Sequence, residues 1–179
     1  RIPAASGERT VFSGDGPPKV TDAVLALTGG GSLPNAAWTL GVPSPTLAPG
    51  VSTTGSAGVG EQVVDRYYVY TFVNAQGEEG GVSPVSAVLS AYASQDVVLS
   101  ALEVPSGAQG FTSKRIYETQ GVGESADFYL VAEVSAGATS ATFPADSANR
   151  PNPAGTVAAI GSKLRTADFY PPPETLFCL

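Results

Sequence analysis

The chain has 179 residues, of which 42% are hydrophobic and 14% are charged, and its formal net charge at pH 7 is −7. This length can bury one good core or two small cores joined by a linker, and the composition fits neither a disordered tail nor a coiled coil. The nine scattered lysines and arginines argue against a nucleic-acid partner, because phosphate binding needs clustered basic side chains. No apolar run approaches the roughly 20 residues that span a bilayer, and no signal-peptide pattern opens the chain, so no membrane partner is expected.

Residues 1–60 have little regular pattern and are interpreted as an extended, partly irregular arm. Within it, Arg9–Phe12 is expected to be a short strand, and Asp22–Leu27 is either a strand or a helical turn. With so few periodic residues the arm is expected to lack its own core and to lie along a neighbouring subunit. The alternative is a flexible linker, which the glycine run Gly29–Gly31 favours.

Residues 61–146 carry regularly spaced strand signals with turn residues between them, and they predict an all-β sandwich domain. The first strand is aromatic on both faces, so it is expected to be central in its sheet, although alternation alone does not tell which face points inward. The expected strands are Val63–Val73, Val85–Tyr92, Asp96–Leu102, Thr112–Thr119, Phe128–Val134 and Thr139–Phe143.

Residues 147–179 are rich in proline and are interpreted as an extended connector to a further domain. Ala154–Leu164 is the best helix candidate of the chain, but its two glycines make it a weak one. The absence of methionine at position 1 and the apolar end Leu176–Leu179 indicate that the chain is a fragment of a longer protein.

Two segments resemble strands of fibronectin-type-III domains. Tyr70–Glu79, followed by Ser83-Pro84, resembles the late strand of that family, in which a tyrosine-rich strand runs into Asn-x-x-Gly and then Ser-Pro. Lys114–Thr119 resembles an early strand of the same family. Because the late element comes first in this chain, the resemblance implies a permuted domain, or the end of one repeat running into the next.

The succession of elements along most of the chain resembles a set of tailed-phage virion proteins. The resemblance implies a fibronectin-III/Ig-like β-sandwich with an irregular arm and a proline-rich connector. It also implies a structural component of the virion tail or neck, with other virion proteins and further copies of itself as partners, and it carries over no catalytic, cofactor or metal site. The matching segments are Thr10–Thr21, Leu40–Pro45, Tyr70–Glu79, Arg115–Tyr117, Phe128–Glu133 and Leu164–Pro173.

Motifs of enzyme active sites are scarce, so no enzyme is expected. The chain has no histidine, which removes the usual general base and the commonest metal ligand. Glu78 and Glu79 are adjacent, so on a strand they would point to opposite faces and would not form a convergent acid pair. Gly121–Ala126 matches Gly-x-Gly-x-x-Ala, but it links two expected strands and is interpreted as a hairpin loop.

The acidic and the aromatic residues each suggest a binding hypothesis, for calcium and for glycans respectively. Six acidic residues could in principle hold calcium at the ends of loops, but none has the spacing of a known calcium-binding loop. They are interpreted as solvated turn residues: Asp15, Asp22, Glu78, Glu79, Glu124 and Asp127. The alternative to a structural role is a glycan-binding or adhesion module of a phage fibre or bacterial surface protein. Its platform would be Tyr92, Tyr117, Phe128 and Tyr129, although core and cross-strand packing is the simpler interpretation of these rings. Cys178 has no intrachain partner for a disulfide, and its place beside the last residue favours a buried apolar role or a cut-off context over catalysis.

Overall fold

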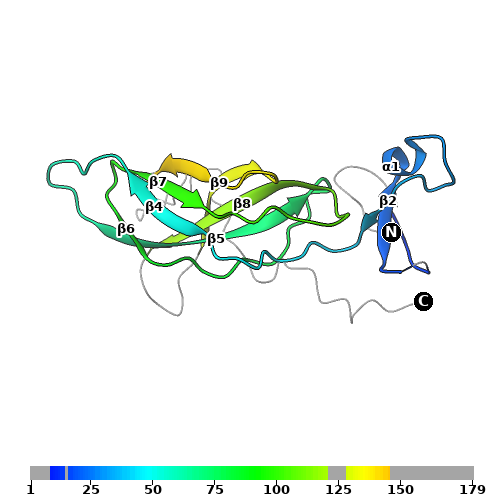
Figure 1. Ribbon diagram of the computed structural model, residues 1–179, viewed down its shortest axis with the longest axis horizontal. Helices are drawn as coiled ribbons and strands as arrows, with labels where there is room; N and C mark the ends of the chain where they lie inside the picture. Colours follow the sequence, from blue (N-terminus) through cyan, green and yellow to red (C-terminus); the bar gives the residue numbers. More distant parts are fainter. Residues whose placement is uncertain (1–8, 15, 121–127, 146–179) are drawn as a thin grey trace.

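The computed structural model describes residues 9–14, 16–120 and 128–145, which form ten strands and one short helix (Figure 1). The arrangement confirms the all-β class. The elements are β1 (Arg9–Phe12), β2 (Lys19–Asp22), α1 (Ala23–Leu27), β3 (Trp38–Thr39), β4 (Gly50–Thr54), β5 (Val64–Asn74), β6 (Leu89–Ala91), β7 (Asp96–Ser100), β8 (Phe111–Gln120), β9 (Tyr129–Ser135) and β10 (Ala141–Pro144).

Three antiparallel sheets make up the described part of the chain. A sheet with the strand order β10-β7-β4 and a sheet with the order β6-β5-β8-β9 stack as two layers. A small sheet, β1-β2-β3, lies with α1 at one end of these layers (Figure 1). We call β1–β3 with α1 the end module, and β4–β10 the sandwich.

Strand β5 is central, as its two apolar faces predict. It lies between β6 and β8, and its register with β8 runs from Arg66 opposite Gln120 to Asn74 opposite Phe111. The tertiary structure decides which face is inward: Tyr68, Tyr70 and Phe72 belong to the buried core.

The core lies between the two layers, and aromatic rings make up much of it. Tyr68 contacts Phe143 of the opposite layer with 5.9 Å between ring centroids, in an edge-to-face arrangement. Phe72 contacts both Tyr70 and Phe111 in the same geometry, which is favourable beyond the burial of area alone. Strand β7 contributes Val97 and Leu99, while the other core residues are Leu89, Ala91, Leu102, Ile116, Val131, Ala141 and Ala145.

The described part of the arm expected over residues 1–60, which is residues 9–14 and 16–60, has more regular structure than its sequence pattern indicates. Residues 9–39 contain the end module, and Gly50–Thr54 forms β4, which pairs with β7 in the sandwich. The sandwich therefore begins before residue 61, and that boundary needs correction. Strand β4 is held by its pairing with residues 96–100, far along the chain, and its own residues show no alternation of apolar and polar side chains that would predict a strand.

The expected strand over Val85–Tyr92 is wrong in its first half, because regular pairing in β6 begins only at Leu89. Residues 80–88 instead run beside β5 as an irregular segment, which we call the ribbon. Gly80, Ser83 and Ser86 donate their amide hydrogens to the carbonyl oxygens of Phe72, Tyr70 and Tyr68, at 3.0, 2.9 and 3.0 Å. Three residues of the ribbon therefore lie opposite two residues of β5 at each step, as in a succession of β-bulges.

Serine side chains complete this unusual pairing. The amide of Tyr70 donates to the hydroxyl oxygen of Ser83 at 3.1 Å, and the amide of Tyr68 donates to that of Ser86 at 3.0 Å. A hydroxyl thus replaces each backbone carbonyl that a regular strand would have supplied. This satisfies buried amides of the central strand, which would otherwise cost free energy.

The connector expected over residues 147–179 and the hairpin loop Gly121–Ala126 lie outside the described residues. Within the described residues, no helix is long and apolar enough to span a membrane.

Candidate functional site

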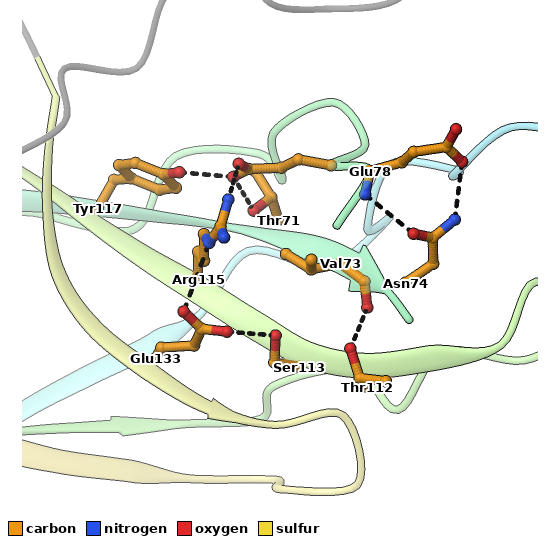
Figure 2. Close-up of polar contacts among 10 residues, drawn as sticks. Thr71, Val73, Asn74, Glu78, Thr112, Ser113, Arg115, Tyr117 and Glu133 are labelled. Atoms are coloured by element: carbon orange, nitrogen blue, oxygen red, sulfur yellow. Dashed lines mark hydrogen bonds and ion pairs between the residues drawn. The ribbon is translucent and has the colours of Figure 1, made fainter. Parts of the chain in front are cut away.

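A polar network of the sandwich lies on the outer face of the four-stranded sheet (Figure 2). Alternation along β8 directs Lys114, Ile116 and Glu118 into the interior, so Ser113, Arg115 and Tyr117 lie on the opposite face. Glu79, in the turn that follows β5, extends over this face and meets these side chains.

Glu79 is the centre of the network. Its Oε1 accepts hydrogen bonds from the Tyr117 hydroxyl at 2.6 Å and from the Thr71 hydroxyl at 2.5 Å. Its Oε2 accepts from Arg115 Nη1 at 2.8 Å, which completes an ion pair. One carboxylate therefore joins the turn to both β5 and β8.

Arg115 also contacts the neighbouring strand β9. Its Nε lies 3.4 Å from Glu133 Oε2, and the Ser113 hydroxyl donates to Glu133 Oε1 at 2.6 Å. The Glu133 side chain is 47% exposed, so this second pair is solvated and contributes little to stability. Arg115 thus lies between two carboxylates and balances part of their charge (Figure 2).

The electrostatics of this network oppose acid–base chemistry. Burial, together with the hydrogen bond and the negative charge of Glu79, raises the pKa of Tyr117 well above its ordinary value. The phenol therefore keeps its proton at neutral pH and acts as a donor. Glu79 accepts three hydrogen bonds, so its carboxylate acts as the acceptor that joins these side chains.

A second cluster, around Asn74, shapes the turn that presents Glu79. The Asn74 side-chain oxygen accepts from the amides of Gln76 and Glu78, at 3.0 and 2.9 Å. Its side-chain nitrogen donates to Glu78 Oε2 at 2.8 Å, and Gly77 adopts a φ of +75°, which suits glycine. The Asn-x-x-Gly motif therefore makes the turn that its sequence predicts.

The same turn attaches the end module to the sandwich. Arg9 Nη1, on β1, donates to Glu78 Oε1 at 2.5 Å and to Gln76 Oε1 at 2.9 Å. On the other side of this joint, the Thr39 amide of β3 donates to the carbonyl oxygen of Ala108 at 2.8 Å. The polar residues around Asn74 therefore serve to fix one part of the molecule against another.

The structure separates the two adjacent acids, Glu78 and Glu79. The Glu78 carboxylate contacts Arg9 and Asn74, whereas the Glu79 carboxylate contacts Tyr117 and Arg115. They do not converge on a shared point as a carboxylate pair for hydrolysis would.

The aromatic platform is not assembled as the glycan hypothesis requires. Tyr117 is buried, with only 3% of its surface exposed, and its hydroxyl is engaged by Glu79. Tyr92 follows β6, while Tyr129 lies in β9, at the far edge of the sheet order β6-β5-β8-β9. Strands β6 and β9 are three strand spacings apart, which is about 14 Å, so Tyr92 and Tyr129 are too far apart for one ring-stacking surface. Phe128 and Tyr129 remain half-buried neighbours at one edge.

The candidate calcium ligands are likewise dispersed. Asp22 caps α1, where its Oδ1 accepts from the Leu25 amide at 2.9 Å. In the part of the chain that the structure describes, no group of three or more acidic, histidine or cysteine side chains is arranged to hold a metal ion. The candidates Asp15, Glu124 and Asp127 lie outside it, as does Cys178, which was expected to be apolar.

Sequence reasoning missed Arg115 and Glu133 as members of the network. Their pairing depends on the register of β8 with β9, in which Arg115 stands opposite Glu133. The opposite charges of Arg115 and Glu133 could have indicated a cross-strand pair. That indication can be used only once the pairing of the two strands is known.

Comparisons with protein-family models, with curated proteins and with solved structures found no match to this chain.

Proposed function

We propose that this chain is a structural component of a tailed-phage particle, in the tail or neck, that acts through subunit contacts in a multi-copy assembly. Its partners would be other virion proteins and further copies of itself. The polar contacts of the turn after β5 support a mechanical role, because Glu79 fixes the turn to β8 and Glu78 fixes it to the end module.

The observation that carries the proposal is the apolar surface of the end module. Helix α1 has the sequence Ala-Val-Leu-Ala-Leu, and none of its residues is buried. Val24, Leu27 and Leu33 are 77%, 65% and 71% exposed, while Val20 is the one large apolar residue of residues 9–39 that is fully buried. Short helices depend on packing for their stability, so an exposed apolar helix of this kind fits a surface that is covered on assembly.

A rearranged fibronectin-type-III-like domain is the finer fold that we infer for the sandwich. Three strands face four, as in seven-stranded sandwiches of the immunoglobulin type. Strand β5, with the late-strand signature, pairs directly with β8, which carries the early-strand signature. Strands that are distant in family order but adjacent in space fit a permuted chain.

Purified particles from the source of this sequence test the role. We expect mass spectrometry to detect the chain at several copies per particle, and images of the particle to place the sandwich in the tail or neck with α1 against a neighbouring subunit. Absence of the chain from particles that are otherwise complete would refute the role. Detection in the particle with α1 facing solvent would remove its main support.

A further inference from the structure

The ribbon carries a second apolar surface that the end module does not explain. Gly80, Ser83 and Ser86 face β5 and are buried, as is Leu89 at the start of β6. The residues between them point away from β5. Val82, Val85 and Val88 are 37%, 52% and 50% exposed and follow one another at every third position, and we call them the valine row.

The hydrogen bonds of the ribbon set this row at even steps along β5. Each three-residue step of the ribbon matches two residues of β5, as the hydrogen bonds to Phe72, Tyr70 and Tyr68 establish. Two residues of an antiparallel strand span about 6.8 Å, so the row extends over about 14 Å. Pro84 and Ala87, which are also exposed, broaden it into an apolar stripe.

The stripe is also free of charge. No aspartate, glutamate, lysine or arginine occurs between Gly80 and Gln95, in a chain whose net charge is −7. Two copies of such an acidic chain repel each other over most approaches. Contact between residues 80–95 of two copies brings no like charges of these segments together.

The backbone of the ribbon is a poor template for another strand. Pro84 has no amide hydrogen, and its carbonyl oxygen accepts from the Ser83 hydroxyl at 2.9 Å. The carbonyl oxygen of Ala87 accepts from the Ser86 hydroxyl at 2.7 Å. A partner is therefore recognised by the side chains of the row and not by an extended ladder of backbone hydrogen bonds.

We propose that the valine row is a self-contact, which packs antiparallel against the same row of a second copy across a two-fold axis. The row is symmetric about Val85, so the axis brings the two copies of Val85 together and sets Val82 of each copy against Val88 of the other. One patch thus supplies both halves of the interface, as an isologous contact requires.

The expected strength follows from the size of the row. Three valines on each copy make a contact well below the roughly 1,200 Å² of a standard stable interface. The isolated chain should therefore form a weak dimer that depends on concentration, and further contacts in an assembly would reinforce it. The inference rests on the proposed structural role, to which it adds the partner and the surface.

Cross-linking of the full chain with Cys178 replaced by serine tests the contact. We expect V85C to form a disulfide-linked dimer under mild oxidation at least 10-fold faster than V104C. Val104 is the matched control, because it is 50% exposed but lies between β7 and β8, outside the valine row and the end module. Equal rates for the two variants would overturn the proposal.

Sedimentation of charge variants provides a second, independent measurement. The average mass of the wild-type chain should rise with concentration, V85D should stay monomeric because two carboxylates then meet at the axis, and V104D should behave as wild type. A V85D variant that associates like wild type, or a wild type monomeric at every concentration, overturns the valine contact. Either result leaves the particle analysis unaffected, so failure of this contact and failure of the structural role are distinguishable.

Discussion

At the scale of single residues, the sandwich interior contains a buried ion pair that apolar patterning does not foresee. Arg66 Nη1 donates to Glu118 Oε1 at 3.1 Å, and both side chains are only 2% exposed. Arg66 also donates to the carbonyl oxygen of Ala145, while the Tyr68 hydroxyl donates to the other Glu118 oxygen. A charged pair in a dry interior is tolerated because each member is hydrogen-bonded more than once.

Removal of one member of this pair should be severely destabilising. We expect R66M to lower the free energy of unfolding by about 3–5 kcal/mol, because it breaks the buried ion pair with Glu118 and the hydrogen bond to the carbonyl oxygen of Ala145. Urea titration followed by circular dichroism measures the change. E133Q is the control: its exposed ion pair with Arg115 should cost no more than about 1 kcal/mol. Similar losses in both variants would contradict the assigned importance of burial.

At the scale of elements, the ribbon beside β5 is a segment in which side chains complete the backbone pairing. Ser83 and Ser86 each accept from an amide of β5 and donate to the following carbonyl oxygen of the ribbon. The sequence contains the signal as a three-residue repeat, with valine and serine in Val82-Ser83-Pro84 and again in Val85-Ser86-Ala87. Strand prediction looks for apolar residues at every second position, so it overlooks a segment in which valine recurs at every third position.

Loss of these hydroxyls should weaken the ribbon and leave the rest of the sandwich folded. S83A and S86A each remove the acceptor of a buried amide, so we expect each to cost about 1–3 kcal/mol. Hydrogen exchange should become faster at the Tyr70 amide in S83A and at the Tyr68 amide in S86A.

Ser90 provides the matched control for these two serines. Its hydroxyl donates to Asp65 Oδ1 at an exposed site, so S90A should change stability by less than about 0.5 kcal/mol. Unchanged exchange at Tyr68 and Tyr70 in the two ribbon variants would show that the hydroxyls do not hold this edge.

At the scale of the whole molecule, the end module and the sandwich meet through a thin joint. Trp38 of β3 lies against Gly110, where an added Cβ would come within 2.4 Å of the indole ring. Arg9 with Glu78 forms the other side of the joint. Because Trp38 is the one tryptophan of the chain, its fluorescence reports on this joint directly.

Substitution of Gly110 should disturb the joint. Gly110 and Gly60 have φ values of +68° and +80°, so alanine at either position should cost about 1–2 kcal/mol of backbone strain. Only G110A should also shift the Trp38 emission and increase its quenching by acrylamide, because nothing lies within 4 Å of an added Cβ at Gly60. Wild-type emission and quenching in G110A would argue that the ring does not dock there.

Much of the fold was predictable because its signals are local. Strands β5, β7, β8, β9 and β10 appear within a few residues of their expected positions, because alternation and the turns between them are properties of neighbouring residues. The turn after β5 was equally clear, since Asn74 and Gly77 make it with their own side chain and backbone. The candidate site was less predictable, because Glu79 contacts Arg115, which lies 36 residues away in the sequence.

The sequence by itself determined that this chain is all-β, where most strands and turns lie, and which strand has two apolar faces. Only the tertiary structure decided that β4 pairs with β7, that Arg66 and Glu118 share the interior, and that the valine row points outward. The difference is one of range. Backbone preference and side-chain alternation are set by adjacent residues, whereas pairing, register and burial depend on which distant segments exclude water together.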